Sequence, residues 1–223
     1  MKAVLISIKP QWCEKIANGK KTVEVRKTRP KLETPFKVYI YCTNAKPFLV
    51  WGDVFRGNWE TEITTVHGYS RKDADAKWGI FNGRVLGEFI CNNVECFTTD
   101  YRMNEEQTKR ISGLSCLDMV SLMEYEANAH CLYGWHISEL KIYDEPKLLF
   151  DFYKCGALSP EELDDSLCGY CSQTDYGDKK EIHTPNYTWM CEGRWCVDAY
   201  QEYLDDEFAL TRPPQSWCYV QEV

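Results

Sequence analysis

The sequence has no run of about eighteen apolar residues, so no segment is long enough to cross a bilayer as a helix. Its N-terminus also lacks the basic segment and apolar core of a secretory signal, and we therefore expect a cytoplasmic protein. Internal repeats and low-complexity linkers are absent too. A chain of 223 residues, of which 14% are aromatic, is long enough for one packed core, and we predict a single domain over 1–223 with insertions.

An overall positive charge is also missing. The net charge of -8 argues against indiscriminate binding to a phosphate backbone. The charge is unevenly distributed, because residues 1–40 hold ten Lys and Arg against three Glu, a net of +7, whereas the remainder carries -15. A basic N-terminal face beside an acidic body suits selective contact with a small anionic group. The alternative is that these charges only keep the surface solvated.

Cysteine, in contrast, is plentiful. Twelve cysteines without a secretory signal indicate a reducing compartment, where cysteine clusters bind metal more often than they form disulfides. Four thiolates suit a tetrahedral structural zinc ion, and we predict one such ion, with Cys155 and His183 as alternatives for one ligand. The rival interpretation is free thiols or a redox pair. The predicted ligands follow a C-x2-C and a C-x4-C spacing: Cys168, Cys171, Cys191 and Cys196.

The segment at the centre of the functional argument begins after a short predicted helix, Pro10 to Asn18. Asn18-Gly19 is a turn signal, because both residue types tolerate positive φ. Residues 22–26 then alternate polar and apolar side chains, as a half-buried strand does. Val23 and Val25 would face the core, and Thr22, Glu24 and Arg26 would share the opposite face. Alternation does not determine the direction of Lys21, which lies at the junction of turn and strand.

This segment resembles a known family. Gly19, Lys21, Glu24 and Arg26 match the G-x-K-x-x-E-x-R pattern of the ASCH domain family. Further blocks at 7–10, 38–43, 83–89, 135–138 and 213–220 also resemble that family, the last two its phage-type and bacterial members. The resemblance implies an α+β, PUA-like fold, in which a small β-barrel is flanked by helices.

Between the matched blocks we predict three insertions: a hairpin-like one at about 44–82, a helical one at about 98–133 and a Cys-rich one at about 155–212. The helical insertion should contain helices at 105–110 and 117–130, with a break at Ser112-Gly113. Strands are expected at 3–9, 36–42, 84–97, 135–143 and 216–220, the third of them bent near Gly87 or at Asn92-Asn93.

Lys21, Glu24 and Arg26 are the leading candidates for chemistry. A desolvated lysine can act as a base, the planar guanidinium of Arg26 can hold a phosphate, and Glu24 can accept protons from an exocyclic amine. In the competing structural interpretation, Glu24 and Arg26 form an ion pair and Lys21 is solvated. We predict binding of RNA or a nucleotide, with a modified base as one candidate, through a cleft at the barrel mouth. The predicted ligand-binding residues are Lys9, Lys21, Glu24, Arg26, Tyr41 and Ser216.

Two other functions stay open. A branch of the superfamily hydrolyses N4-acetylcytidine, and it resembles this chain at Gly19, Lys21 and Arg26 but carries a threonine nucleophile where this chain has Glu24. Thr22 is a poor substitute, because two residues along a strand displace its hydroxyl by roughly 6–7 Å. An amidohydrolase or ribonuclease would therefore use Lys21 and Glu24 as catalytic residues. The third candidate is a module that binds a protein partner through the acidic Cys-rich insertion.

Overall fold

The computed structural model describes residues 1–55, 59–99, 105–127, 129–157, 180–183, 188–191 and 204–222. The chain divides into two compact units, one of residues 1–149 with 212–222 and the other of residues 150–211. No helix in the described part of the chain is long and apolar enough to cross a membrane.

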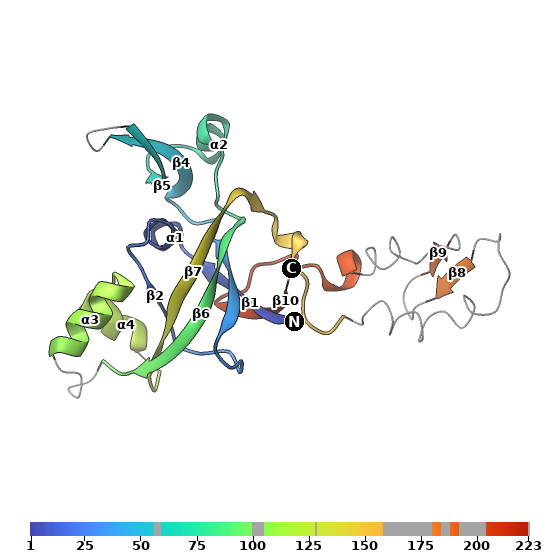
Figure 1. Cartoon of the computed structure of the whole chain (residues 1–223). Coiled ribbons are helices and arrows are strands. Elements are labelled where there is room, and N and C mark those ends of the chain that lie inside the picture. The colour runs from blue at the N-terminus through green and yellow to red at the C-terminus, as the bar shows by residue number, and fades with distance from the viewer. Residues whose placement is uncertain are drawn as a thin grey trace. The chain divides into compact units, whose positions relative to one another are not determined.

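A six-stranded sheet forms the first unit, in the order β10-β1-β3-β6-β7-β2 (Figure 1). Strands β1 and β3 are parallel, and the other pairs are antiparallel. The mixed α+β class is therefore as predicted. The strand bounds are β1 Lys2–Ile8, β2 Val23–Arg26, β3 Phe36–Cys42, β6 Val85–Phe97, β7 Leu132–Lys147 and β10 Trp217–Gln221.

The sheet curls without closing through its ladders. Among the described residues, no ladder joins the end strands β2 and β10. Side chains bridge the two ends instead. Trp217 Nε1 of β10 donates to Thr28 Oγ1, just beyond β2, over 3.0 Å, and Arg26 of β2 donates to the Ser7 carbonyl of β1 over 2.7 Å. The described residues thus form an open, curled sheet whose two ends are bridged by side chains, and the closed barrel that the resemblance implies is not shown.

The main core follows the strand alternation. Val4, Ile6 and Ile8 of β1 pack with Phe89 of β6 and Trp135 of β7 in one buried cluster. Strand β6 runs as one strand, and its pairing with β7 shifts register between Val85 and Gly87, between Glu88 and Ile90, and between Cys91 and Val94. The first and last shifts fall at the two alternative positions predicted for a bend, near Gly87 and at Asn92-Asn93, and an irregular pairing lets a long strand curve.

Helix α1, Pro10–Ala17, begins with proline at its first position, where the missing N–H is no loss. Gly19 has φ +67°, which ends the helix in a turn leading to β2. Two further helices follow β6, α3 at Glu105–Ser115 and α4 at Met119–Glu126. The predicted break at Ser112-Gly113 is wrong: α3 continues because Ile111 and Leu114 pack on the β2 side of the core, and the chain turns at Cys116, whose φ is +55°.

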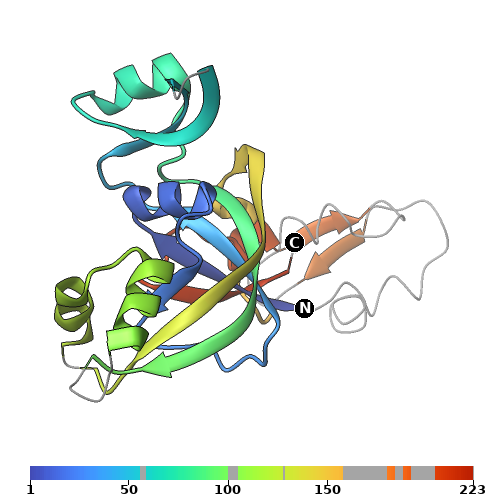
Figure 2. The same cartoon turned by 60° about the vertical axis from the view of Figure 1, so that its left-hand side comes forward.

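The β4–β5 hairpin and α2 form a smaller substructure with its own core. Strands β4, Phe48–Phe55, and β5, Trp59–Val66, pair antiparallel, and α2, Arg71–Trp78, follows. Its buried side chains are Phe48, Val50, Ala74 and Ile80. Figures 1 and 2 show α2 with this hairpin near the start of β6, and α3 and α4 near its end.

Of the second unit, the structure describes four short elements. A 3₁₀ turn at Leu149–Asp151 leads into this unit. Strand β8 (Lys180–His183) pairs with β9 (Thr188–Cys191), and a π-helical turn spans Leu204–Phe208. Backbone hydrogen bonds from Lys154 to Phe208 and from Leu210 to Phe152 join the two ends of this unit.

Candidate functional site

Strand β2 separates an apolar face from a charged one, as its alternation predicts. Val23 and Val25 are buried in a cluster with Ile111 and Leu122, from α3 and α4. Glu24 and Arg26 point to the other side and line a cavity. Thr22 precedes the strand and is not among the residues that line this cavity.

Lys21 is buried, with 2% of its surface exposed. Its Nζ donates to the carbonyl of Ser115, the last residue of α3, over 2.7 Å. A lysine suits this position because the last carbonyls of a helix lack intrahelical partners and carry partial negative charge. The alternative of a solvated Lys21 is therefore wrong, because the ammonium group is held between a helix end and Glu24.

Glu24 lies between two cations and is itself 3% exposed. Its Oε1 is 2.6 Å from Arg26 Nη1, and its Oε2 is 3.2 Å from Lys21 Nζ. The second contact is an ion pair without hydrogen-bond geometry, since Oε2 has no hydrogen-bond partner. Arg26 also donates from Nη2 to the Ser7 carbonyl over 2.7 Å. The amine, carboxylate and guanidinium thus form one buried cluster.

This cluster is part of the wall of a cavity of about 370 Å³. That volume lies in the range of small-ligand sites. The charged lining residues are three cations and one carboxylate, so the wall is positive although the chain as a whole is negative. The lining residues are Ser7, Ile8, Lys9, Trp12, Lys21, Glu24, Val25, Arg26, Thr43, Leu117, Ser121, Tyr125, Gln215 and Ser216.

Unpaired polar atoms are concentrated here. Among the described residues, four buried side-chain atoms lack a hydrogen-bond partner, and three of them belong to lining residues: Glu24 Oε2, Arg26 Nε and Thr43 Oγ1. A buried polar group without a partner costs about 1–3 kcal/mol, so folded proteins contain few of them. A guanidinium N–H, a carboxylate oxygen and a hydroxyl left unpaired in side chains that line one cavity favour a polar occupant, which these groups can reach by small side-chain movements.

The structure distributes the predicted ligand-binding residues unevenly. Lys9 and Ser216 both line the cavity, and Lys9 is exposed. Tyr41 is buried in β3 and is not a lining residue, and desolvation raises the pKa of its phenol. Thr43, two residues further along the chain, lines the cavity in its place.

Sequence reasoning missed the wall contributed by the helical insertion. Leu117, Ser121 and Tyr125 line the cavity from the α3–α4 connection and from α4. They recur every fourth residue, and this spacing could have identified them, because side chains four apart lie on one helix face. Lys27 Nζ, 5.3 Å from the centre of the Tyr125 ring, holds that ring near the end of β2.

Two titratable groups of the sheet, His136 and Glu88, lie outside the cavity. His136 Nε2 is 2.9 Å from Glu95 Oε1, and Arg110 Nη2 is 2.6 Å from Glu95 Oε2. Burial by itself would raise the pKa of Glu95, but the hydrogen bonds and positive charges of Arg110 and His136 outweigh it and lower the pKa. Glu88 accepts from the Tyr143 hydroxyl over 2.6 Å, so it serves the sheet and not the cavity.

The predicted zinc site lies outside the described residues. Cys168, Cys171 and Cys196 are not described, and of Cys191 and His183 only the strand backbone is. Within the described residues, no group of three or more His, Cys, Asp and Glu side chains could hold a metal ion. Zinc binding stays a prediction.

Comparisons with known proteins give structural likenesses only. No family model and no curated protein matches the chain. The crystal structure of ASCH from Zymomonas mobilis is similar at 12% sequence identity and a TM-score of 0.42, over 93% of this chain and 96% of that one. Crystal structures of two point mutants of the same protein match at the same identity and TM-score. These structures bear the name of the family that the sequence resembles, but a likeness at this level establishes neither the ligand nor the reaction of this chain.

Proposed function

We propose that the 370 Å³ cavity binds a nucleotide, either free or as part of an RNA strand. The observation that carries this proposal is the buried cluster of Lys21, Glu24 and Arg26, whose side chains line the cavity and in which Glu24 Oε2 and Arg26 Nε lack hydrogen-bond partners. A carboxylate accepts hydrogen bonds from the exocyclic amine of a base, and a guanidinium N–H donates to a ring nitrogen or carbonyl beside it.

The rest of the wall matches the other parts of a nucleotide. Trp12 and Tyr125 supply aromatic rings, on which bases stack in single-stranded RNA complexes. Lys9 is exposed and lines the same cavity, where its ammonium group can contact a phosphate. A nucleotide combines an amine-bearing edge, a flat ring and an anion, and each has a counterpart among these side chains.

The test uses variants that leave the buried cluster intact. Binding of nucleoside monophosphates and RNA oligonucleotides to the full chain would be measured by calorimetry at several salt concentrations. Tyr125→Ala should weaken binding roughly 5- to 150-fold, as expected for loss of one stacked base. Lys9→Ala should weaken it and lower the salt slope by about one. Lys31→Ala, which removes an exposed cation away from the cavity, is the matched control. Equal effects of Lys9→Ala and Lys31→Ala would contradict the proposal.

A hydrolase is the second candidate, because the Lys21 amine lies 3.2 Å from a carboxylate at the cavity wall. In this mechanism Glu24 would activate a water that attacks the amide of a modified pyrimidine such as N4-acetylcytidine. A threonine nucleophile at position 22 gains no support, since Thr22 does not line the cavity. Incubation with N4-acetylcytidine and with labelled RNA separates turnover from binding. Absence of product at high enzyme concentration, with binding retained, would set hydrolysis aside.

A further inference from the structure

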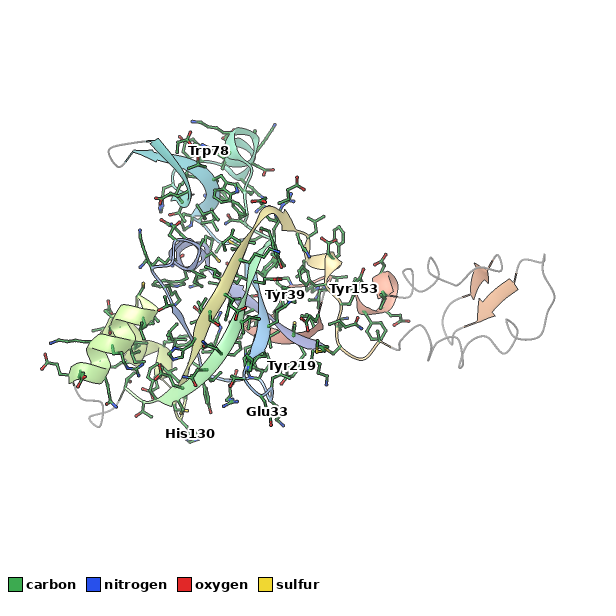
Figure 3. All side chains as sticks on the ribbon, in the orientation of Figure 1. Glu33, Tyr39, Trp78, His130, Tyr153 and Tyr219 are labelled. Carbon is green, nitrogen blue, oxygen red and sulfur yellow. The ribbon has the colours of Figure 1, made fainter. Side chains whose placement is uncertain are left out.

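A second cavity, of about 250 Å³, lies in the first unit between β4, the end of α2 and the start of β6. Figure 3 labels Trp78, one of its lining residues, where α2 lies next to β4. Three aromatic rings dominate the lining, and charged side chains stand beside them. The residues that matter for the argument are Trp51, Asp75, Trp78, Phe81, Arg84 and Pro146.

The aromatic wall is held in place by the local fold. Gly79, with φ +70°, ends α2, and the Phe81 N–H then donates to the Leu49 carbonyl over 2.9 Å, which fixes this turn against β4. Trp51 contacts Phe81 edge to face at 5.8 Å between ring centres, yet 36% of its surface remains exposed. Trp78 is supported by Tyr69 at 5.0 Å. Rigid, partly exposed rings suit stacking against a flat ligand, because little side-chain entropy is lost.

Arg84 and Asp75 at this cavity can each form further hydrogen bonds or ion pairs with a ligand. The Arg84 guanidinium makes no ion pair or side-chain hydrogen bond among the described residues. Within the part of the chain that the structure describes, the Asp75 carboxylate uses only Oδ1, which accepts from the Ile80 N–H over 3.1 Å. A free guanidinium beside aromatic rings suits an anionic aromatic ligand, and a phosphate-linked base is such a ligand.

The two cavities are neighbours through the backbone. The Cys42 N–H donates to the Arg84 carbonyl over 2.9 Å, and Thr43, which lines the first cavity, is the next residue. The Cα atoms of Thr43 and Arg84 are therefore within roughly 9 Å, one Cα step plus one strand spacing. Arg71 donates to the Asn44 side chain over 2.9 Å and to the Asn82 carbonyl over 3.1 Å, so another cation lies close to the chain neighbours of Thr43. A short chain of linked rings and phosphates can cover this distance.

We propose that this aromatic cavity binds the base of a second nucleotide, so that the ligand of the protein is a single-stranded oligonucleotide covering both cavities. The inference rests on the proposed function and deepens it. Trp51 and Trp78 stack the second base, and Arg84 contacts a phosphate next to it. Double-stranded RNA does not fit this arrangement, because its bases are already paired and stacked.

The test compares mononucleotides, dinucleotides and hexanucleotides of each base, with the full chain and with variants. A dinucleotide should bind roughly 5- to 150-fold more tightly than a mononucleotide. Trp51→Ala and Arg84→Ala should each reduce that gain and leave mononucleotide affinity unchanged, because neither residue lines the first cavity. Lys72→Ala on α2 and Phe150→Ala remove an exposed charge and an exposed ring elsewhere and should preserve the gain.

The outcomes distinguish failure of this inference from failure of the proposed function. Mononucleotide binding without a gain for dinucleotides, or a gain unaffected by both variants, would overturn this inference and leave the proposed function intact. No binding of any nucleotide would overturn both. Aromatic-lined grooves also bind proline-rich peptides, so a polyproline peptide is included. Peptide binding lost in Trp51→Ala, with no dinucleotide gain, would assign the cavity to a protein partner. Circular dichroism of Trp51→Ala checks its fold, and the exposed Arg84→Ala provides the independent variant.

Discussion

Replacement of Lys21 by methionine should destabilise the protein strongly, because methionine fills much of the same volume but cannot donate. The change removes the 2.7 Å hydrogen bond to the Ser115 carbonyl, and a hydrogen bond from a charged donor contributes about 1.5–3 kcal/mol. It also leaves Glu24 with Arg26 as its remaining cation at a buried position. Removal of one partner of a buried ion pair costs about 3–5 kcal/mol, and the two effects overlap, so we expect about 3–5 kcal/mol in total.

The assay is urea unfolding at pH 7, followed by tryptophan fluorescence. Lys20→Met is the control, because Lys20 is the preceding residue, carries the same charge and is exposed. It should change the free energy of unfolding by less than about 0.5 kcal/mol. If Lys21→Met behaved like Lys20→Met, Lys21 would not belong to a buried charge cluster, and the description of the site would be wrong.

Three further predictions concern other parts of the chain. A Cβ on Gly87 would overlap the Lys141 carbonyl, so Gly87→Ala should destabilise the folded protein by about 1–3 kcal/mol. Gly113 lies on α3 with open space around it, so Gly113→Ala should stabilise the protein by up to about 1 kcal/mol. Thermal unfolding of the two variants tests this contrast. Glu95→Gln should cost about 1 kcal/mol at pH 7. Because the pKa of Glu95 is lower in the folded chain, its contribution is present above about pH 4.3 and is lost as the pH falls through the folded pKa, so unfolding curves of Glu95→Gln and the unchanged chain should converge in acid. Metal analysis of purified protein should find about one zinc per chain, and less in Cys168→Ser; no zinc, with freely titratable thiols, would reject the metal site.

The sequence predicts the elements around β2 well because two local rules act together there. Proline at the first helical position and glycine after Asn18 mark the ends of α1, and alternation places Glu24 and Arg26 on one face of the strand. The same rules do not predict the direction of the Lys21 side chain, because Lys21 lies in a turn, where no periodicity applies. Its burial depends on the end of α3, a contact between residues 94 positions apart.

The parts that could not be predicted depend on tertiary contacts. The sequence predicts a helical insertion at about 98–133 but not its part in the site: Ser121 and Tyr125 line the cavity because α3 and α4 pack over β2. The break expected at Ser112-Gly113 failed because packing of Ile111 overrides the low helix propensity of glycine. The end strands β10 and β2 are joined by the hydrogen bond from Trp217 to Thr28, and no pattern in the neighbouring sequence indicates this contact.

The central claim is that the cluster of Lys21, Glu24 and Arg26, in which Glu24 Oε2 and Arg26 Nε lack hydrogen-bond partners, forms the wall against which a nucleotide binds in the 370 Å³ cavity. A crystal structure of the full chain soaked with a mixture of nucleoside monophosphates tests it most directly. We predict a base beside Trp12 or Tyr125, with its polar edge within hydrogen-bond distance of the Glu24 or Arg26 side chain. A nucleotide bound only elsewhere, or a cavity filled by water alone at saturating ligand, would contradict the account.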